Sequence, residues 1–166
     1  MLHSLTIIRP WIGLVAAGHK HLEIRPVRTH HRGLLALHAG QQCDLAVSAF
    51  LRGLGVLDRT DDGGPAGAVV AVATVVGCRP WDIERDDDIW GAYHQNLKPS
   101  QLREVRERNL IGRTGAQAWE LEHVVRIPPV HCRGHQGMWI LPDNVEAVVR
   151  SHYAKGNESS SQGRLF

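Results

Sequence analysis

The chain has 166 residues, of which 43% are hydrophobic and 22% are charged, a composition that is ordinary for a globular protein. That length suits one domain with a substantial hydrophobic core, and two full domains would be tight. The net charge is +2 with histidine neutral. Such a mild charge does not by itself indicate a nucleic-acid-binding protein, so any anion site must come from the local placement of charged residues.

Cysteine usage and hydropathy predict the compartment. The three cysteines, Cys43, Cys78 and Cys132, are far apart and form no C-x-x-C pair, which argues against a zinc ribbon or a disulfide framework. We expect reduced thiols. No apolar run approaches the ~20 residues that span a bilayer, and the first residues lack the basic-then-apolar plan of a secretory signal. The sequence therefore predicts a cytoplasmic protein without a membrane segment.

The first half of the chain is predicted to alternate short strands with short helices. Pro10 ends the first β-prone run and can open a helix, and Gly18 is a candidate C-terminal cap for that helix. Apolar and polar residues then alternate from Lys20 to Arg25, which is typical of a strand. The predicted elements are strands at 5–9, 20–25 and 34–39 and helices at 11–18 and 43–54.

The second half begins with the longest apolar run, Ala68–Gly77, whose β-branched content predicts a buried strand. Pro128 and Pro129 are expected to close a later strand, and the polar residues from 154 to 166 are expected to be disordered. The remaining predicted elements are helices at 99–109 and 142–153, a strand at 118–127 and a last short strand after the turn at 134–137.

Five or six short strands with a few helices predict an α+β fold, a small mixed β-barrel with flanking helices. The domain is expected to cover residues 1–153, followed by the tail at 154–166.

The stretch from Gly18 to Pro26 carries more charge than a core strand needs. Glu23 and Arg25 are two residues apart on the predicted strand and share a face, whereas strict alternation would place Lys20 on the opposite face from Glu23. The three side chains converge only if the chain is still turning at Lys20. Lys20 and Arg25 suit a phosphate or a base carbonyl, and Glu23 suits a general base or an acceptor for a base amino group. The alternative is an edge-strand ion pair between Glu23 and Arg25 with Lys20 in solvent.

The order of these motifs resembles that of the ASCH domain, a member of the PUA-like superfamily. The family pattern is a strand, a Q/R-P-W/Y turn, a helix and then G-x-K-x-x-E-x-R. The resemblance continues through the later strands and covers about Leu2–Pro142. This chain supplies the pattern with Arg9, Pro10 and Trp11, followed by Gly18, Lys20, Glu23 and Arg25.

The resemblance implies a PUA-like barrel with a cleft between barrel and helices, and recognition of RNA or a nucleotide in that cleft. Some ASCH proteins are ribonucleases, and one small bacterial branch is an amidohydrolase that removes the acetyl group from acetylated cytidine nucleosides. In that branch a threonine, taken as the nucleophile, occupies the position of Glu23. A glutamate cannot replace it directly, so the amidohydrolase mechanism is in doubt here.

These considerations predict a site and three functional hypotheses. The protein is an RNA- or nucleotide-binding module, a hydrolase of the ribonuclease or nucleoside amidohydrolase type, or a regulatory interaction module. No metal or cofactor is expected, and the oligomeric state is not predicted. The expected catalytic residues are Lys20 and Glu23, and the expected ligand-binding residues are Arg9, Trp11, Arg25, Arg28, His38 and Gln136.

Several of these residues have structural alternatives. Trp11 could pack the first helix onto the barrel, His38 could be a hydrogen-bonded structural histidine, and Arg28 could lie in an exposed polar loop. One of the two late-strand carboxylates, Glu120 or Glu122, is expected to approach Lys20 across the sheet, and the sequence leaves open which one.

Overall fold

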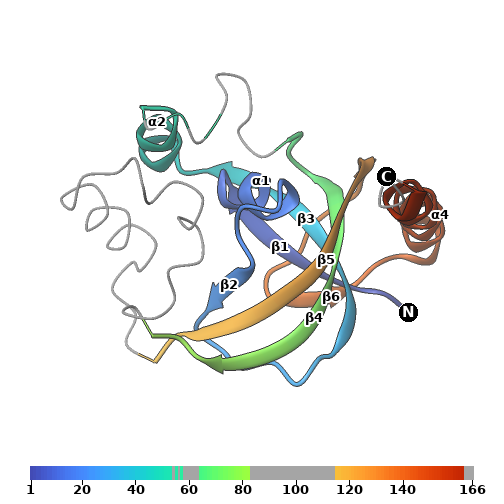
Figure 1. The fold of residues 1–166 in the computed structure, drawn as a ribbon, viewed down its shortest axis with the longest axis horizontal. Helices are drawn as coiled ribbons and strands as arrows, with labels where there is room; N and C mark the ends of the chain where they lie inside the picture. The colour runs from blue at the N-terminus through green and yellow to red at the C-terminus, as the bar shows by residue number, and fades with distance from the viewer. Residues whose placement is uncertain (54, 56, 58–63, 83–114, 163–166) are drawn as a thin grey trace.

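A six-stranded mixed sheet organises the protein in a computed structural model that describes residues 1–53, 55, 57, 64–82 and 115–162 (Figure 1). The order of the strands in the sheet is β2-β5-β4-β3-β1-β6. β1 and β3 run parallel, and the other neighbours are antiparallel. The strands are β1 (His3–Arg9), β2 (Leu22–Arg25), β3 (Gly33–Cys43), β4 (Ala68–Pro80), β5 (Gln117–His131) and β6 (Met138–Ile140).

The sheet curls like a barrel but does not close, because β2 and β6 remain its two edges. The predicted α+β fold with a mixed sheet of five to six strands and flanking helices is therefore confirmed, with an open seam between the two edge strands. The helices of the described residues are α1 (Trp11–Ala16), α2 (Leu45–Gly53) and α4 (Asp143–Gln162).

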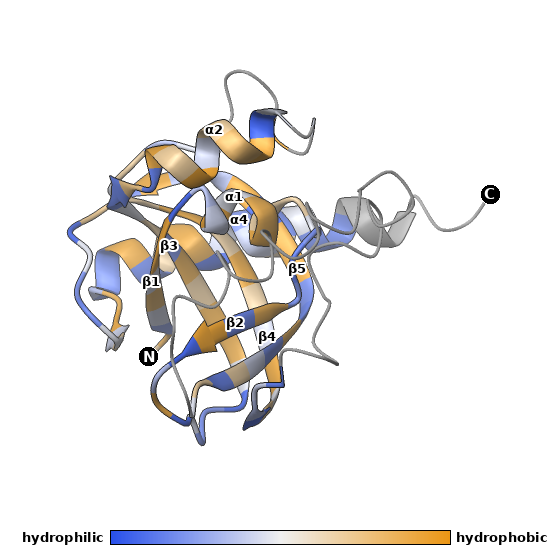
Figure 2. Cartoon of the chain, turned by 90° about the vertical axis from the view of Figure 1, so that its left-hand side faces the viewer, coloured by the Kyte–Doolittle hydropathy of each residue, from blue (hydrophilic) through white to orange (hydrophobic). Residues whose placement is uncertain are grey.

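Hydrophobic side chains form two clusters, one on each face of the sheet. Residues on β3 alternate between them: Leu35 and Leu37 join the cluster that packs against α1 and α2, and Ala36 joins the cluster beneath α4. Val145 and Val149 bring α4 onto the second cluster. The strands of the sheet are accordingly coloured largely as hydrophobic in Figure 2.

Two proline residues behave differently from the prediction. β5 was expected to end before Pro128 and Pro129, but it continues to His131. The register with β4 shifts here, so that Arg126 lies opposite Ala71 and Val130 lies opposite Val69. The prolines thus occupy a bulge, where the strand can do without the ladder hydrogen bonds that a proline cannot donate.

The C-terminal helix is longer than expected. It reaches Gln162, so the predicted tail at 154–166 is helical over most of its length rather than disordered. Tyr153 packs against the second cluster, and Gly156 approaches Val125 so closely that an added Cβ would lie 2.8 Å from its Cγ1. A helix already anchored by packing adds further turns at little cost, so polar residues extend it.

The other predictions from the sequence can be placed on this fold. The strand at 68–77 and the helices at 11–18, 43–54 and 142–153 correspond to β4, α1, α2 and α4. The helix expected at 99–109 lies outside the described residues. Among the described residues, no helix combines the length and the apolar character that a membrane span requires.

Candidate functional site

The turn between α1 and β2 determines where Lys20 points. Gly18 adopts a φ of 77°, and its N–H donates to the carbonyl of Val15 at 3.0 Å. The next two amides, those of His19 and Lys20, both donate to the carbonyl of Leu14. The chain is therefore still turning at Lys20, before β2 begins, as convergence with Glu23 requires.

Lys20, Glu23 and Arg25 form what we call the charged cluster. Lys20 Nζ lies 3.0 Å from Glu23 Oε2 and also donates to the carbonyl of Leu22. Arg25 Nη1 lies 3.5 Å from the other carboxylate oxygen, Oε1. The side chains of Lys20 and Glu23 are only 3% and 7% exposed, and that of Arg25 is 23% exposed. The alternative in which Lys20 is solvated does not hold.

The charged cluster lines a cavity of about 810 Å³. The cavity lies between the edges of the open sheet: β2 lines one side, and the segment just before β6 lines the other. We call that segment, residues 132–137, the Cys132–Gly137 segment. Residues of β1 and β3 also contribute, and apolar side chains such as Ile7 and Trp11 lie among the polar ones. The volume is within the range typical of small-molecule sites.

His38 lies on the cavity with both ring nitrogens engaged. Nε2 lies 3.1 Å from the carbonyl oxygen of Cys132, and Nδ1 lies 3.3 Å from Thr6 Oγ1. The Trp139 indole N–H donates to the same Thr6 oxygen at 3.2 Å. Burial lowers the pKa of His38 from its usual 6.5; the hydrogen bond to Cys132 opposes this shift, and nearby His135 adds to it.

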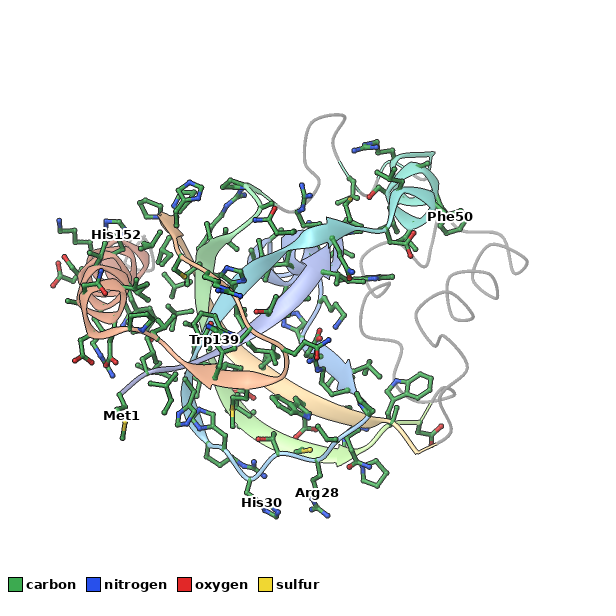
Figure 3. The ribbon with its side chains drawn as sticks, turned by 180° about the vertical axis from the view of Figure 1, so that it is seen from behind. Met1, Arg28, His30, Phe50, Trp139 and His152 are labelled. Carbon is green, nitrogen blue, oxygen red and sulfur yellow. The ribbon has the colours of Figure 1, made fainter. Side chains whose placement is uncertain are left out.

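Other predicted site residues divide into two groups. Trp11 and Gln136 line the cavity, and Trp11 also belongs to the hydrophobic core, so it can both pack α1 onto the sheet and present an edge to a ligand. Arg9 and Arg28 are not among the lining residues. Arg9 donates to the carbonyl of Gln41 at 3.0 Å. Arg28 is exposed and points outward from the connection between β2 and β3 (Figure 3).

Neither late-strand carboxylate reaches the charged cluster, so that expectation is wrong. Glu120 binds Arg79 at 2.9 Å and lies over Gly77, where an added Cβ would be 1.7 Å from its Oε2. Glu122 is exposed beside His123. The register pairs Leu22 with Glu120, and a paired side chain on the outer face of the sheet cannot turn into the cavity.

Further polar residues on the cavity were not predicted, among them Gln41 and Gln42 on β3. Thr6 lies on β1, and Arg133 and His135 flank Gly134 in the Cys132–Gly137 segment. A polar, glycine-containing stretch between two strands was the available signal for the last two. Thr6 gave none, because a threonine in a β-prone run is ordinary. Within the described part of the chain, no three His, Cys, Asp or Glu side chains are grouped to hold a metal ion.

Comparison with solved structures shows that the fold is that of ASCH proteins. An ASCH protein from Zymomonas mobilis aligns with 90% of this chain and 93% of its own, at 15% identity and a TM-score of 0.52. A tyrosine-to-phenylalanine mutant of the Zymomonas mobilis protein aligns with a TM-score of 0.52, and a serine-to-alanine mutant with 0.51, each at 15% identity over 90% of this chain and over 96% and 94% of theirs. No protein-family model and no curated protein matches the sequence.

Proposed function

We propose that the cavity binds a nucleotide, either free or as an unpaired residue of an RNA. The observation that carries this proposal is the buried Lys20–Glu23 pair, which lines a cavity together with Arg25. Two ions removed from water cost several kcal/mol each, and apolar residues of similar volume often replace such a pair without loss of stability. A role in ligand recognition explains better than stability why these charges are present.

The chemistry of the lining fits a nucleotide. Among the described lining residues, Lys20, Arg25 and Arg133 are cationic and Glu23 is anionic, so the cavity favours a ligand with net negative charge. Arg25 is partly exposed and can bind a phosphate or a base carbonyl through two N–H groups. Glu23 can accept from a base amino group, and the ring of Trp11 offers an aromatic edge or face to a base.

Hydrolysis is the second candidate, favoured by the 3.0 Å contact between an ammonium and a carboxylate in the cavity. In a ribonuclease reaction the RNA 2′-hydroxyl would lose its proton to Glu23 and attack the adjacent phosphorus. The P–O5′ bond would break, the leaving 5′-oxygen would take a proton from water, a 2′,3′-cyclic phosphate would form, and Lys20 would stabilise the developing negative charge. Both oxygens of Glu23 already contact cations, so neither can approach the 2′-hydroxyl without giving up an ion pair, which favours binding over catalysis.

An amidohydrolase acting on an acetylated cytidine is the least supported alternative. A threonine nucleophile at the position of Glu23 is absent from this chain.

We infer a cytoplasmic location from the cysteines. Cys43, Cys78 and Cys132 are free, which suits a protein in a reducing compartment.

The binding proposal is tested by calorimetric titration of the protein with ribonucleosides, nucleoside monophosphates and a short single-stranded RNA. We expect at least one of them to bind. Its affinity should fall as salt rises, with a shallow slope of about −0.7 per phosphate contacted in a plot of the logarithm of the binding constant against the logarithm of the salt concentration. Lys20→Ala should abolish this binding, whereas the exposed control Glu122→Gln should leave it unchanged. Failure of every probe to bind at millimolar concentration would overturn the proposal.

Catalysis is tested separately by incubating labelled RNA, and acetylcytidine, with purified protein in EDTA. If the protein is a hydrolase, Glu23→Gln should lower turnover about 10²–10⁴-fold while binding is nearly retained, because the amide has the same shape and keeps one acceptor oxygen. Binding without any product, or equal turnover by wild type and Glu23→Gln, would leave the binding module as the function.

A further inference from the structure

The Cys132–Gly137 segment forms one side of the cavity, and its main chain is held at Cys132. The amide of Cys132 donates to the carbonyl of Gly67 at 3.1 Å, and its carbonyl is bound by His38. The rest of the segment exposes Arg133, His135 and Gln136, all of which line the cavity. The position of these three side chains toward a ligand therefore depends on a residue of β3, His38.

The hydrogen-bond partners of His38 determine which ring nitrogen carries the proton. A carbonyl oxygen only accepts, so Nε2 must carry a hydrogen and donate to Cys132. An indole N–H only donates, so Thr6 Oγ1 accepts from Trp139 (labelled in Figure 3), and its own hydrogen is left for His38 Nδ1. The neutral ring with hydrogen on Nε2 thus satisfies every group of the chain Trp139–Thr6–His38–Cys132.

A protonated ring keeps its Nε2–H bond to Cys132 but changes the bond at Nδ1. Nδ1 would then carry a hydrogen directed at Thr6 Oγ1 and could no longer accept from the Thr6 hydroxyl. The Thr6 hydroxyl hydrogen would have to turn away from its acceptor in this partly buried network, and a lost hydrogen bond of this kind typically costs ~0.5–1.5 kcal/mol. Of the charged or titratable groups around the cavity, His135 acts directly on the ring, and Arg133, the Cys132 thiol and the charged cluster line the same cavity.

Close packing adds to the hydrogen bond. A Cβ on Gly134 would lie 2.3 Å from His38 Cε1, 2.6 Å from Nδ1 and 3.0 Å from Thr6 Oγ1. The backbone of the segment therefore rests directly on the imidazole. The φ of Gly134 is not in the left-handed region, so backbone conformation does not require a glycine here. The close approach does, because any side chain would collide with the ring.

We propose that His38 is a positioning residue that holds the Cys132–Gly137 segment against the cavity, and that protonation of Nδ1 lowers ligand affinity because it breaks the bond to Thr6 on which Gly134 rests. The second half of this inference rests on the proposed function, because it needs a ligand. The expected change of ligand affinity with pH is opposite to the one that a direct contact would give. A protonated histidine that touched a phosphate would strengthen binding as the pH falls.

The positioning role is tested without a ligand, by NMR of the full chain. Nitrogen shifts of the His38 ring should report hydrogen on Nε2 near neutral pH. The amides of Gly134 and Gly137 should shift with the titration of His38, and in His38→Asn they should lose their wild-type shifts at every pH. In His38→Gln they should stay near wild type and no longer follow that titration, because the Gln amide reaches about as far as Nε2 and does not titrate.

The matched control is His31→Asn, which removes a histidine that also binds a main-chain oxygen, that of Leu34, but lies outside the cavity lining. It should leave both glycine amides unchanged. A proton on Nδ1 in the wild type, or glycine amides indifferent to His38→Asn, would overturn the positioning role whatever the protein binds. If His38→Asn fails to fold, Gly134→Ala decides the same question, with Gly53→Ala on α2 as its control because nothing lies near that Cβ.

The pH effect is tested with a short single-stranded RNA that contains all four bases, whose phosphodiesters do not titrate between pH 5 and 8. We expect affinity to fall about threefold to tenfold across the titration of His38 in the wild type, and not in His38→Gln. Affinity that rises as the pH falls in the wild type but not in His38→Gln would mean that His38 contacts the RNA directly. That result would overturn the proposed loss of affinity on protonation. If no RNA binds, the proposed function fails, while the NMR result still decides the positioning role.

Discussion

Among the residues that the structure describes, two carboxylates each lie between two cationic groups, and they differ in what surrounds them. Glu23 binds Lys20 and Arg25 on the cavity, and its partner Lys20 is buried. Glu146 binds Arg150 and the N-terminal ammonium of Met1, at 2.8 and 3.3 Å, and both partners are exposed. We call Met1, Glu146 and Arg150 the amino-terminal cluster.

The amino-terminal cluster ties the start of the chain to α4. Glu146 Oε2 also accepts from the amide of Leu2 at 2.8 Å, and Leu2 belongs to the hydrophobic cluster beneath α4. This arrangement has a structural use that needs no ligand. The charged cluster has no comparable tie between distant elements, since its three members lie within six residues. Two similar ion clusters thus differ in their surroundings: one joins distant parts of the chain, and the other is buried beside a cavity.

The largest expected effect is the loss of folding stability when one charge of the charged cluster is removed. Lys20→Ala leaves Glu23 buried with only the longer contact to Arg25, so we expect a loss of about 3–5 kcal/mol in the free energy of unfolding, measured by urea titration. The control Lys20→Met with Glu23→Gln removes both charges and should recover most of that stability without restoring ligand binding. A loss below ~1 kcal/mol for Lys20→Ala would contradict a buried pair.

Arg25→Lys should affect ligand binding more than stability. A lysine keeps the charge but cannot make two parallel hydrogen bonds, so we expect affinity for the ligand to drop by about tenfold. The unfolding midpoint should change little, because the Arg25 side chain is partly exposed and its ion-pair contact with Glu23 is long. Unchanged affinity for every probe would show that Arg25 does not grip the ligand bidentately.

The amino-terminal cluster should respond to acid. The hydrogen bond from Arg150 comes first among the causes that lower the pKa of Glu146 from its usual 4.5; the Leu2 amide and the N-terminus add to it, and burial opposes it. A depressed pKa means that the ionised carboxylate stabilises the folded state above about 4.5, and that this stabilisation is lost as the pH falls through the lowered pKa. The melting temperatures of wild type and Glu146→Gln should differ near neutral pH and converge in acid. A difference that persisted in acid would point to packing instead of charge.

Salt should produce the smallest difference and still separate the two clusters. Raising the salt from about 0.05 M to about 1 M shortens the screening length to ~3 Å, which weakens ion pairs open to solvent far more than buried ones. The effect of Glu146→Gln on the melting temperature should therefore shrink with salt, whereas that of Lys20→Ala should stay nearly constant. Equal shrinkage of both effects would mean that solvent reaches Lys20.

The charged cluster could be predicted because its residues are close in the sequence. The spacing of Lys20, Glu23 and Arg25, with Gly18 before them, already required a turn for the side chains to meet, and the turn is there. The buried strand β4 and the helices α1, α2 and α4 followed likewise from local hydropathy and caps. Local patterns failed where packing decides: β5 continues through its prolines at a bulge, and α4 continues through polar residues.

Most strands and the charged side of the cavity could therefore be read from local patterns, because short-range geometry controls both. The other side of the cavity depends on long-range contacts. The contact between His38 and Cys132 joins residues 94 positions apart, and that between Trp139 and Thr6 joins residues 133 positions apart. Tertiary structure also turned Glu120 away toward Arg79. Such contacts depend on the order and register of strands in the sheet, which no pattern within one element encodes, and the state of the His38 ring follows from them.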